Sequence, residues 1–266
     1  MAVKFPEFER NAIDIHSHFD HGAEGEQNGF GMLSVSTLDF MQEDNQRFGI
    51  KEVGYSTYAS VLSSANIVEE NAYLNGLLKE NKDLYQWVVV HPLQEETFRQ
   101  AERMLENPRV LGIKIHSPMH KYDVRAYGDQ IFSFANAHNA TVLMHPDKIL
   151  DMPQFADRYP NMKLIIAHQG GGFAAETRAC APIIRDHENA YMELCGSLDN
   201  ALPTEAIVDM VGEDKVIFGT DAINLDPKYE LGKVAFAPMK DEVKKKIFAE
   251  NYLKVLQYSQ LGKINL

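Results

Sequence analysis

The chain has 266 residues, of which 45% are apolar and 24% are charged, and it carries a formal net charge of −12. This composition excludes a disordered chain and predicts a globular fold with a full hydrophobic core. The acidic balance argues against nucleic-acid binding, because proteins that hold phosphates usually display a dominant basic surface. A small molecule is therefore the expected partner.

Cysteine usage and the first residues of the chain bear on its compartment. Cys180 and Cys195 are the only cysteines, too few for a disulfide framework, which favours a reducing environment. Segment 1–18 has scattered charges and no apolar signal-peptide core, and no stretch approaches the roughly 18 uninterrupted apolar residues of a membrane helix. We expect a cytoplasmic protein with no membrane partner. A homodimer is the base-rate expectation for its assembly.

Short apolar or β-branched runs alternate along the chain with amphipathic segments, a pattern typical of βαβ units around a parallel sheet. Eight runs are expected strands: 12–16, 51–56, 85–90, 110–115, 140–145, 163–168, 190–195 and 215–220. Expected helices include 68–81, 95–107 and 127–139, with a final amphipathic helix over 240–256. No repeat or linker divides the chain, so residues 1–266 are predicted to form one domain.

Eight strand–helix units in about 250 residues fit a (β/α)8 TIM barrel, although an open doubly wound sheet would show similar patterning. The positions of the polar residues decide between the two folds. Every strand of a barrel delivers its last residues to one common mouth, where active sites are built. We therefore predict an α/β protein with a single (β/α)8 TIM barrel.

Histidines close most of the expected strands. At or just after the strand ends lie His16, His18, His91, His116, His145 and His168, and Asp221 follows the last strand. In "DIHSH", the spacing of two residues places His16 and His18 on the same face of an extended strand. The two imidazoles can therefore bind one ion.

Neutral imidazole and carboxylate are the ligands that ions such as Zn²⁺ favour, and a catalytic site commonly keeps one position open for water. His16, His18, His145 and Asp221 are predicted to form such a shell for one divalent ion. Each residue alone has a structural explanation: a strand-end histidine usually makes a hydrogen bond, and Asp221 could cap a helix. Their joint occurrence at strand ends favours the metal site.

This ordered set of motifs resembles the amidohydrolase superfamily, and specifically the amidohydrolase-2 family of metal-dependent TIM-barrel enzymes. The motifs are "IDIHSHFD", "GIKIHSP", "VLMHPD", "LIIAHQGGG" and "VIFGTDA", which together span residues 13–222. The resemblance implies that His16, His18 and His145 are metal ligands. It also implies that Asp221 is a ligand or the proton acceptor of the activated water, and that His168 polarises the substrate or shuttles a proton. We expect Zn²⁺, with Mn²⁺ and Fe²⁺ as alternatives.

Two positions fit the family less well. Lys114 shares a strand face with His116, and in two-metal members a lysine here is carboxylated and bridges two ions, so a second ion is expected only if Lys114 carries that group. The alternative is an amine that binds an anionic substrate or pairs with Glu193. On the seventh strand, Glu193 and Cys195 stand where the family tends to have an aspartate. Cys195 could be a soft ligand or a nucleophile, but a free cysteine is more often a small buried hydrophobe.

The predicted function is a metal-dependent hydrolase that uses a metal-activated water on a small amide, lactone or ester. The alternative is a nonoxidative decarboxylase or hydratase, a lyase of the same family acting on a small carboxylic acid. A TatD-type deoxyribonuclease is disfavoured because that family carries a glutamate where this chain reads "GIKIH". A non-catalytic metal-binding barrel is a further alternative. Candidate substrate contacts at the mouth, each of which could instead be an ordinary loop residue, are Tyr58, Lys114, His116, His120, Arg125 and Arg178.

Overall fold

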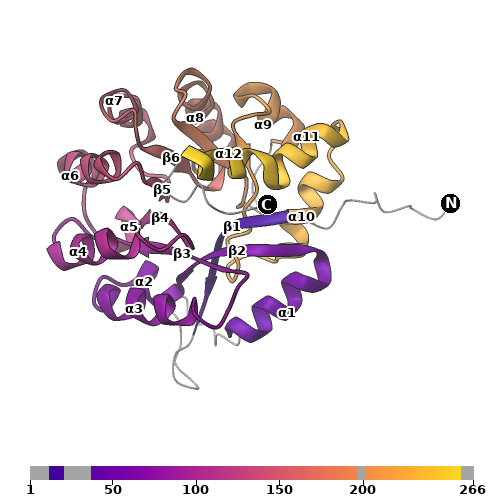
Figure 1. Cartoon of the computed structure of the whole chain (residues 1–266). Helices are drawn as coiled ribbons and strands as arrows, with labels where there is room; N and C mark the ends of the chain where they lie inside the picture. The colour runs from indigo at the N-terminus through magenta and orange to yellow at the C-terminus, as the bar shows by residue number, and fades with distance from the viewer. Residues whose placement is uncertain (1–11, 21–36, 197–201, 259–266) are drawn as a thin grey trace.

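In the computed structural model, residues 12–20, 37–196 and 202–258 are described. Eight parallel strands neighbour one another in chain order, from β1 to β8. Their bounds are Ala12–Phe19 (β1), Ile50–Thr57 (β2), Leu84–Val89 (β3), Val110–Ile115 (β4), Thr141–Met144 (β5), Lys163–Ile166 (β6), Ala190–Glu193 (β7) and Val216–Ile217 (β8). Helices surround this sheet as an outer ring (Figure 1).

The first and last strands meet and close the barrel. The amide of Ile15 donates a hydrogen bond to the carbonyl oxygen of Phe218 (3.3 Å). In the other direction, the amide of Asp221 donates to the carbonyl oxygen of His16 (2.6 Å). A β-bridge joins Ser17 to Ala222. The prediction of a (β/α)8 TIM barrel is confirmed, and an open doubly wound sheet is excluded because the two edges are joined.

The connecting segments supply the outer helices. The α-helices are Leu38–Phe48 (α1), Tyr58–Leu62 (α2), Ile67–Leu77 (α3), Glu95–Met104 (α4), Ser117–His120 (α5), Val124–Ala137 (α6), Met152–Arg158 (α7), Ala174–Asp186 (α8), Thr204–Val211 (α9), Pro227–Ala235 (α10), Asp241–Lys245 (α11) and Asn251–Tyr258 (α12). Short helical turns lie at Ile149–Asp151 (η1) and His168–Gly170 (η2), and a π-helical turn at Lys246–Glu250 (η3) joins α11 to α12. The predicted helix over 240–256 is therefore three consecutive helical pieces.

Five strands end one to three residues earlier than the sequence pattern predicts, and the largest differences are in β6, β7 and β8. β6 ends at Ile166, before His168, and β8 ends at Ile217, well before Asp221. His168 and Asp221 have φ angles of 55° and 52°, in the left-handed region that an extended strand cannot include. Non-glycine residues held in this region cluster at functional sites, so the early ends set both side chains at the mouth.

The hydrophobic core has two layers. The inner layer fills the barrel with side chains that include Ile15, Trp87 and Ile165, and Tyr252 and Val255 of α12 pack against it. A larger outer layer lies between the strands and the helical ring. Because α12 contacts residues near the strand starts, it closes the barrel end opposite the mouth, and it lies across the barrel in Figure 1.

An irregularity in β1 turns the side chains of His16 and His18 toward the barrel interior. Ile13 and Ile15 belong to the inner layer, so strict alternation would turn His16 and His18 away from the barrel interior. The pairing of β1 with β2 shifts register between Asp14 and Ser17. A bulge of this kind re-aims the side chains that follow it. The two imidazoles therefore share the interior with Ile15.

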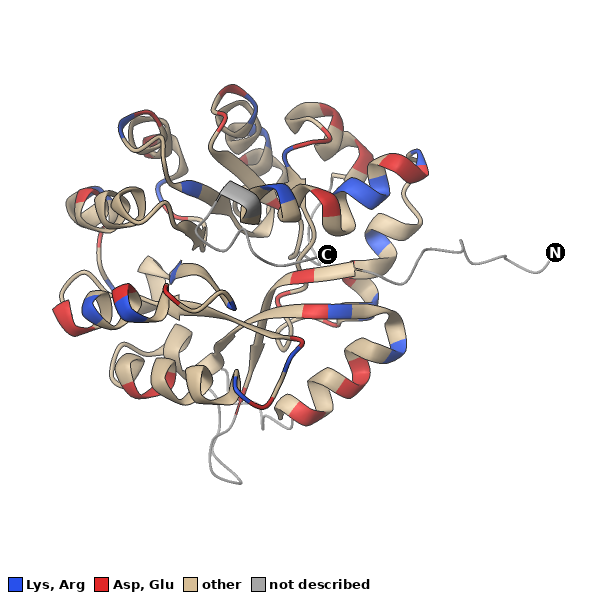
Figure 2. Cartoon of the chain, in the orientation of Figure 1, with Lys and Arg blue, Asp and Glu red and all other residues tan. Residues whose placement is uncertain are grey.

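Acidic and basic residues are interspersed along the outer helices (Figure 2). On α4, for example, Arg99 pairs with both Glu95 (2.7 Å) and Glu96 (2.8 Å) in exposed positions. Exposed pairs of this kind contribute little to stability. Among the residues that the structure describes, no helix has the length and apolar character needed to cross a bilayer.

Candidate metal centre

Three predicted ligands converge at the barrel mouth. His16 and His18 come from β1, and Asp221 follows β8 across the closing seam. Asp221 Oδ1 lies 3.5 Å from His16 Nε2 and 3.3 Å from His18 Nε2. All three residues are buried, and their donor atoms lie within 4.8 Å of one another. We call these residues the HHD triad.

Hydrogen bonds on the far sides of the rings fix where the lone pairs point. His18 Nδ1 lies 3.2 Å from the carbonyl oxygen of Ser56 and 3.0 Å from its hydroxyl, and donation to the carbonyl oxygen places the ring proton on Nδ1. His16 Nδ1 lies 3.3 Å from Glu193 Oε2, which assigns the ring proton of His16 in the same way. In these tautomers both Nε2 lone pairs face the carboxylate of Asp221, an arrangement that a cation between them would satisfy.

The distances in the HHD triad fit a divalent ion. For bonds of about 2.0–2.2 Å, the edges of a tetrahedron of nitrogen and oxygen ligands around Zn²⁺ measure about 3.3–3.6 Å. The two measured nitrogen-to-oxygen separations, 3.5 Å and 3.3 Å, lie in this range. These two separations therefore fit a divalent ion between Asp221 and the two histidines.

A cation already lies against the HHD triad. Lys114 Nζ is 2.6 Å from His16 Nε2, and the lysine side chain is buried. Burial lowers the pKa of Lys114 to about 8, although Asp221, Cys195 and Glu193 oppose that shift. The ammonium group thus stands in for the positive charge that the lone pairs of the HHD triad require.

His145, His116 and His168 form a second row of rings beside the HHD triad. The His116 and His145 rings stack at 3.9 Å, and the His145 and His168 ring centroids are 4.7 Å apart. Among the described residues, His145 is not in a donor group as tight as the HHD triad. His145 lies beside the HHD triad, and its role as the fourth ligand stays a prediction.

Burial keeps the imidazole rings of His16, His145 and His168 neutral. It is the main cause that lowers the pKa of His16 well below its ordinary value and that lowers the pKa of His145 to about 2. Burial also lowers the pKa of His168. Burial alone would raise the pKa of Asp221, but the neighbouring His18, His168 and His16 lower it overall. The site therefore presents neutral imidazoles and an ionised carboxylate, the forms that bind a metal ion.

Several residues that the sequence pattern did not single out hold the HHD triad in place. Asp14 Oδ1 accepts from the amides of His16 and Thr220, both at 3.0 Å, and Oδ2 accepts from Thr220 Oγ1 at 2.6 Å. Asn224 Nδ2 donates to Asp221 Oδ2 at 3.1 Å. The position of Asp14 two residues before His16, on the same face of an ideal strand, was the available signal.

The candidate substrate contacts lie in different places. Arg125 lines a cavity of about 540 Å³ with His145 and His168, and its guanidinium pairs with Asp151 at 2.5 Å. Tyr58 is buried, and its hydroxyl donates to Asn224 at 2.7 Å, so it supports Asp221 through that amide. Arg178 is exposed on α8.

Three further histidines have hydrogen bonds of a structural kind. His116 Nδ1 accepts from the amide of Met119 (3.4 Å) at the start of α5. His91 Nε2 lies 3.3 Å from the His120 carbonyl oxygen, and its Nδ1 accepts from the amide of Leu93 (3.2 Å). His120 Nε2 lies 2.9 Å from the carbonyl oxygen of Ser60. These contacts tie the loops after β3 and β4 to α2.

A second cavity, of about 250 Å³, opens onto the HHD triad. His168, Gly171, Phe173, Gly196 and Asp221 are among the residues that line it. His168 and Gly171 also line the cavity of about 540 Å³. A small molecule in either cavity would lie against the ring of His168.

The fold is shared with solved structures of low sequence identity. An amidohydrolase from Burkholderia multivorans with bound zinc aligns with a TM-score of 0.70 at 15% identity, covering 92% of this chain and 98% of that one. A dihydroxybenzoic acid decarboxylase from Polaromonas sp. JS666, with bound manganese and the inhibitor 2-nitroresorcinol, aligns at 0.66 with 15% identity, covering 93% and 97%. A probable 2-pyrone-4,6-dicarboxylic acid hydrolase from Acinetobacter baumannii, with citric acid bound, aligns at 0.68 with 16% identity, covering 92% and 98%.

No curated protein sequence matches the chain. The family described as amidohydrolase (Amidohydro_2) matches residues 13–257, which include the HHD triad, His145 and His168. The match therefore extends over most of the chain, and the resemblance found in the strand-end motifs is confirmed. The chain belongs to the amidohydrolase family Amidohydro_2.

Proposed function

We propose that the chain is a metal-dependent hydrolase that uses a metal-activated water on a small amide, lactone or ester. The observation that carries the proposal is the convergence of His16 Nε2, His18 Nε2 and Asp221 Oδ1. This convergence lies beside a cavity that Asp221 and His168 line. The proposed shell is the HHD triad with His145, and the proposed ion is Zn²⁺, with Mn²⁺ or Fe²⁺ as substitutes.

Each side chain has a distinct proposed task. A divalent ion supplies a Lewis acid and lowers the pKa of water from about 15.7 to about 7. Asp221 accepts the proton of the attacking water and passes it to the leaving group, while Asn224 holds its second oxygen. His168 lies at the wall of both cavities, where its ring can stabilise negative charge on the attacked carbonyl oxygen.

A lyase reaction, nonoxidative decarboxylation or hydration of a small carboxylic acid, is the second candidate. The buried cation Lys114 favours it, because an ammonium 2.6 Å from His16 could hold a substrate carboxylate at the HHD triad. The paired guanidinium of Arg125 lies farther out, at the cavity wall. A carboxylated Lys114, which would bring a second ion, stays a proposal that the lowered pKa of its amine supports.

The test compares two products on one panel. The chain, loaded with Zn²⁺ or Mn²⁺, is incubated with small lactones, amides, esters and aromatic acids, and hydrolysis, which for a lactone is ring opening, and CO₂ release are measured separately. A hydrolase forms hydrolysis products without releasing CO₂, and Asp221→Asn abolishes that activity. Asp226→Asn, a change at the exposed cap of α10, serves as the matched control and keeps it. CO₂ release without hydrolysis would replace the hydrolase with the lyase.

A further inference from the structure

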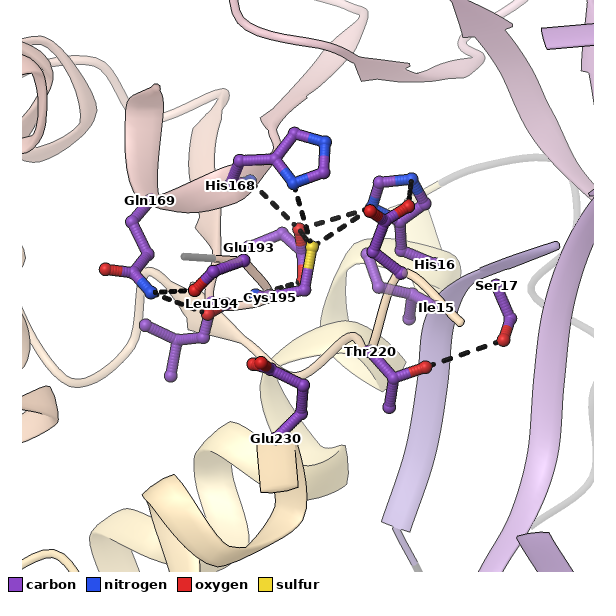
Figure 3. Close-up of polar contacts among 12 residues, drawn as sticks. Ile15, His16, Ser17, His168, Gln169, Glu193, Leu194, Cys195, Thr220 and Glu230 are labelled. Carbon is purple, nitrogen blue, oxygen red and sulfur yellow. Dashed lines mark hydrogen bonds and ion pairs between the residues drawn. The ribbon is translucent and has the colours of Figure 1, made fainter. Parts of the chain in front are cut away.

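A second donor group lies beside the HHD triad and shares His16 with it. Four atoms lie within 4.8 Å of one another: His16 Nδ1, His168 Nδ1, Glu193 Oε2 and Cys195 Sγ. Glu193 and Cys195 come from β7 and the residues that follow it. Figure 3 shows the sulfur of Cys195 between the two imidazoles, with Glu193 against it.

The separations in this group are close to those of metal ligands. Cys195 Sγ lies 3.2 Å from His168 Nδ1 and 2.8 Å from Glu193 Oε2. With bonds of about 2.0–2.3 Å, the edges of a tetrahedron around Zn²⁺ with one sulfur ligand measure about 3.3–3.7 Å. An ion therefore requires these donors to move apart by less than about 1 Å.

The charges in the group also fit a divalent cation. Glu193 and Cys195 are fully buried, and burial raises the pKa of the Cys195 thiol. Once an ion displaces the thiol proton, the carboxylate and the thiolate together carry two negative charges. A divalent ion neutralises both, so the occupied site has no net charge to bury. Thiolate, imidazole and carboxylate together suit a soft or borderline ion such as Zn²⁺ or Cd²⁺ rather than Mg²⁺.

His16 is excluded from this shell by its own proton. Its Nδ1 carries the ring hydrogen that faces Glu193 Oε2, and its Nε2 belongs to the HHD triad. The same N–H group lies 3.4 Å from Cys195 Sγ, where it can donate to a thiolate. The ligands are therefore Cys195, Glu193 and His168, with one position left for a ligand from solution.

The backbone leaves a path to the site. Gly196 follows Cys195 and lines the cavity of about 250 Å³ that also reaches His168. Its φ of 100° lies in the left-handed region, and a Cβ there would approach His168 Nδ1 to 3.1 Å. A glycine at this position thus keeps space open beside the nitrogen that would bind the ion.

We propose that Cys195, Glu193 and His168 form a second metal site, selective for thiophilic divalent ions and separate from the HHD triad. On binding, the Cys195 thiol releases its proton to solvent and its sulfur bonds to the ion, and no electron is transferred. An ion bound there would hold the His168 ring as a ligand, so that this ring would no longer be available to a substrate in the cavity. The site does not depend on which reaction the HHD triad performs.

Cadmium titration of the full-length, metal-free chain tests the proposal, because a cadmium–thiolate bond absorbs in the ultraviolet and imidazole or carboxylate ligation does not. The wild-type chain is expected to bind two Cd²⁺ ions and to develop the thiolate absorption with one of them. Cys195→Ser is expected to bind one ion without the absorption. Cys180→Ser, which changes the other buried cysteine, is the matched control and is expected to behave as wild type.

The wild-type titration alone can overturn the proposal if Cys195→Ser does not fold. Absence of the thiolate absorption at saturating Cd²⁺ contradicts the second site. Absorption that persists in Cys195→Ser or disappears in Cys180→Ser contradicts it as well. In Asp221→Asn, absorption with one remaining ion supports the site. If the wild-type chain binds only one Cd²⁺ ion and shows the thiolate absorption, the second metal site is supported. The same result contradicts metal binding at the HHD triad, and with it the proposed hydrolase.

Discussion

The hydroxyl of Thr220, after β8, donates a hydrogen bond of 2.6 Å to the carboxylate of Asp14 on β1. The amide of Thr220 donates to the other oxygen of the same carboxylate. Because Asp221 follows directly in sequence, this contact fixes the distance between Asp221 and the two histidines of β1. The barrel seam is thus also the support of the HHD triad.

Thr220→Val tests this support. Loss of the hydroxyl leaves the buried Asp14 carboxylate one partner short, which is expected to cost about 1–3 kcal/mol of unfolding free energy. The affinity for Zn²⁺ should fall about 10- to 100-fold, as for other residues that orient ligands. Calorimetric titration and chemical denaturation measure the two effects.

Thr177→Val is the matched control. Thr177 is equally buried, but its hydroxyl donates to the carbonyl oxygen of Phe173 at the start of α8 and not to Asp14. It should lose stability and keep its Zn²⁺ affinity. Equal Zn²⁺ affinity in Thr220→Val and wild type would show that the seam contact does not position Asp221.

Asp221→Asn is expected to weaken Zn²⁺ binding at the HHD triad by at least about 100-fold. The amide keeps the shape of the side chain but removes the negative charge that the two Nε2 lone pairs face. The measurement is competition with a chelator of known affinity, in the Cys195→Ser background so that only the HHD triad is measured. Unchanged affinity would exclude Asp221 from the shell.

Gly112→Ala is expected to destabilise the barrel by several kcal/mol, on the order of 3. Gly112 has a φ of 151°, and its Cβ would lie 2.1 Å from the carbonyl oxygen of Thr141 on the neighbouring strand. Thermal denaturation measures the loss. Gly76→Ala is the control: its Cβ meets no atom within 4 Å in α3, and it should gain about 0.5–1 kcal/mol.

The buried His120, which is not part of the HHD triad, is expected to make the free energy of unfolding depend on pH. Burial lowers the pKa of His120 to about 4, whereas the unfolded chain titrates near the ordinary value of 6.5. The unfolded state therefore binds the proton first, and stability falls as the pH falls from 6.5 to 4, by at most about 3 kcal/mol. In His120→Gln, this part of the decrease in unfolding free energy with falling pH should disappear. Denaturant titrations at pH 4 to 7 measure the unfolding free energy of both proteins. The same pH dependence in the variant and in wild type would contradict the role of His120.

The alternation of strand and helix segments, and the histidines at the strand ends, predicted the barrel and the pairing of His16 with His18. The register shift after Asp14 could not be predicted, because a bulge depends on the neighbouring strand rather than on the local sequence. Nor could the pattern separate a cavity contact from a support: Tyr58 bonds to Asn224, and Arg178 lies on an exposed face of α8.

The left-handed backbone at His168 and Asp221 explains the early ends of β6 and β8. Both residues follow apolar runs that continue the strand pattern, so the expected strands extended to or close to them. Their positive φ angles depend on hydrogen bonds from distant segments, such as the amide of His168 to Glu193 Oε2 at 3.1 Å. Contacts between residues this far apart in the sequence cannot be predicted from the local pattern of apolar and polar residues.

Anomalous diffraction at the zinc edge, from crystals of the Zn²⁺-loaded chain, measures the central claim most directly. A peak is expected about 2.0–2.2 Å from His16 Nε2, His18 Nε2 and an oxygen of Asp221. The same map shows whether His145 supplies a fourth ligand. A map with no peak between these three atoms, or with the ion bound without Asp221, would contradict the account.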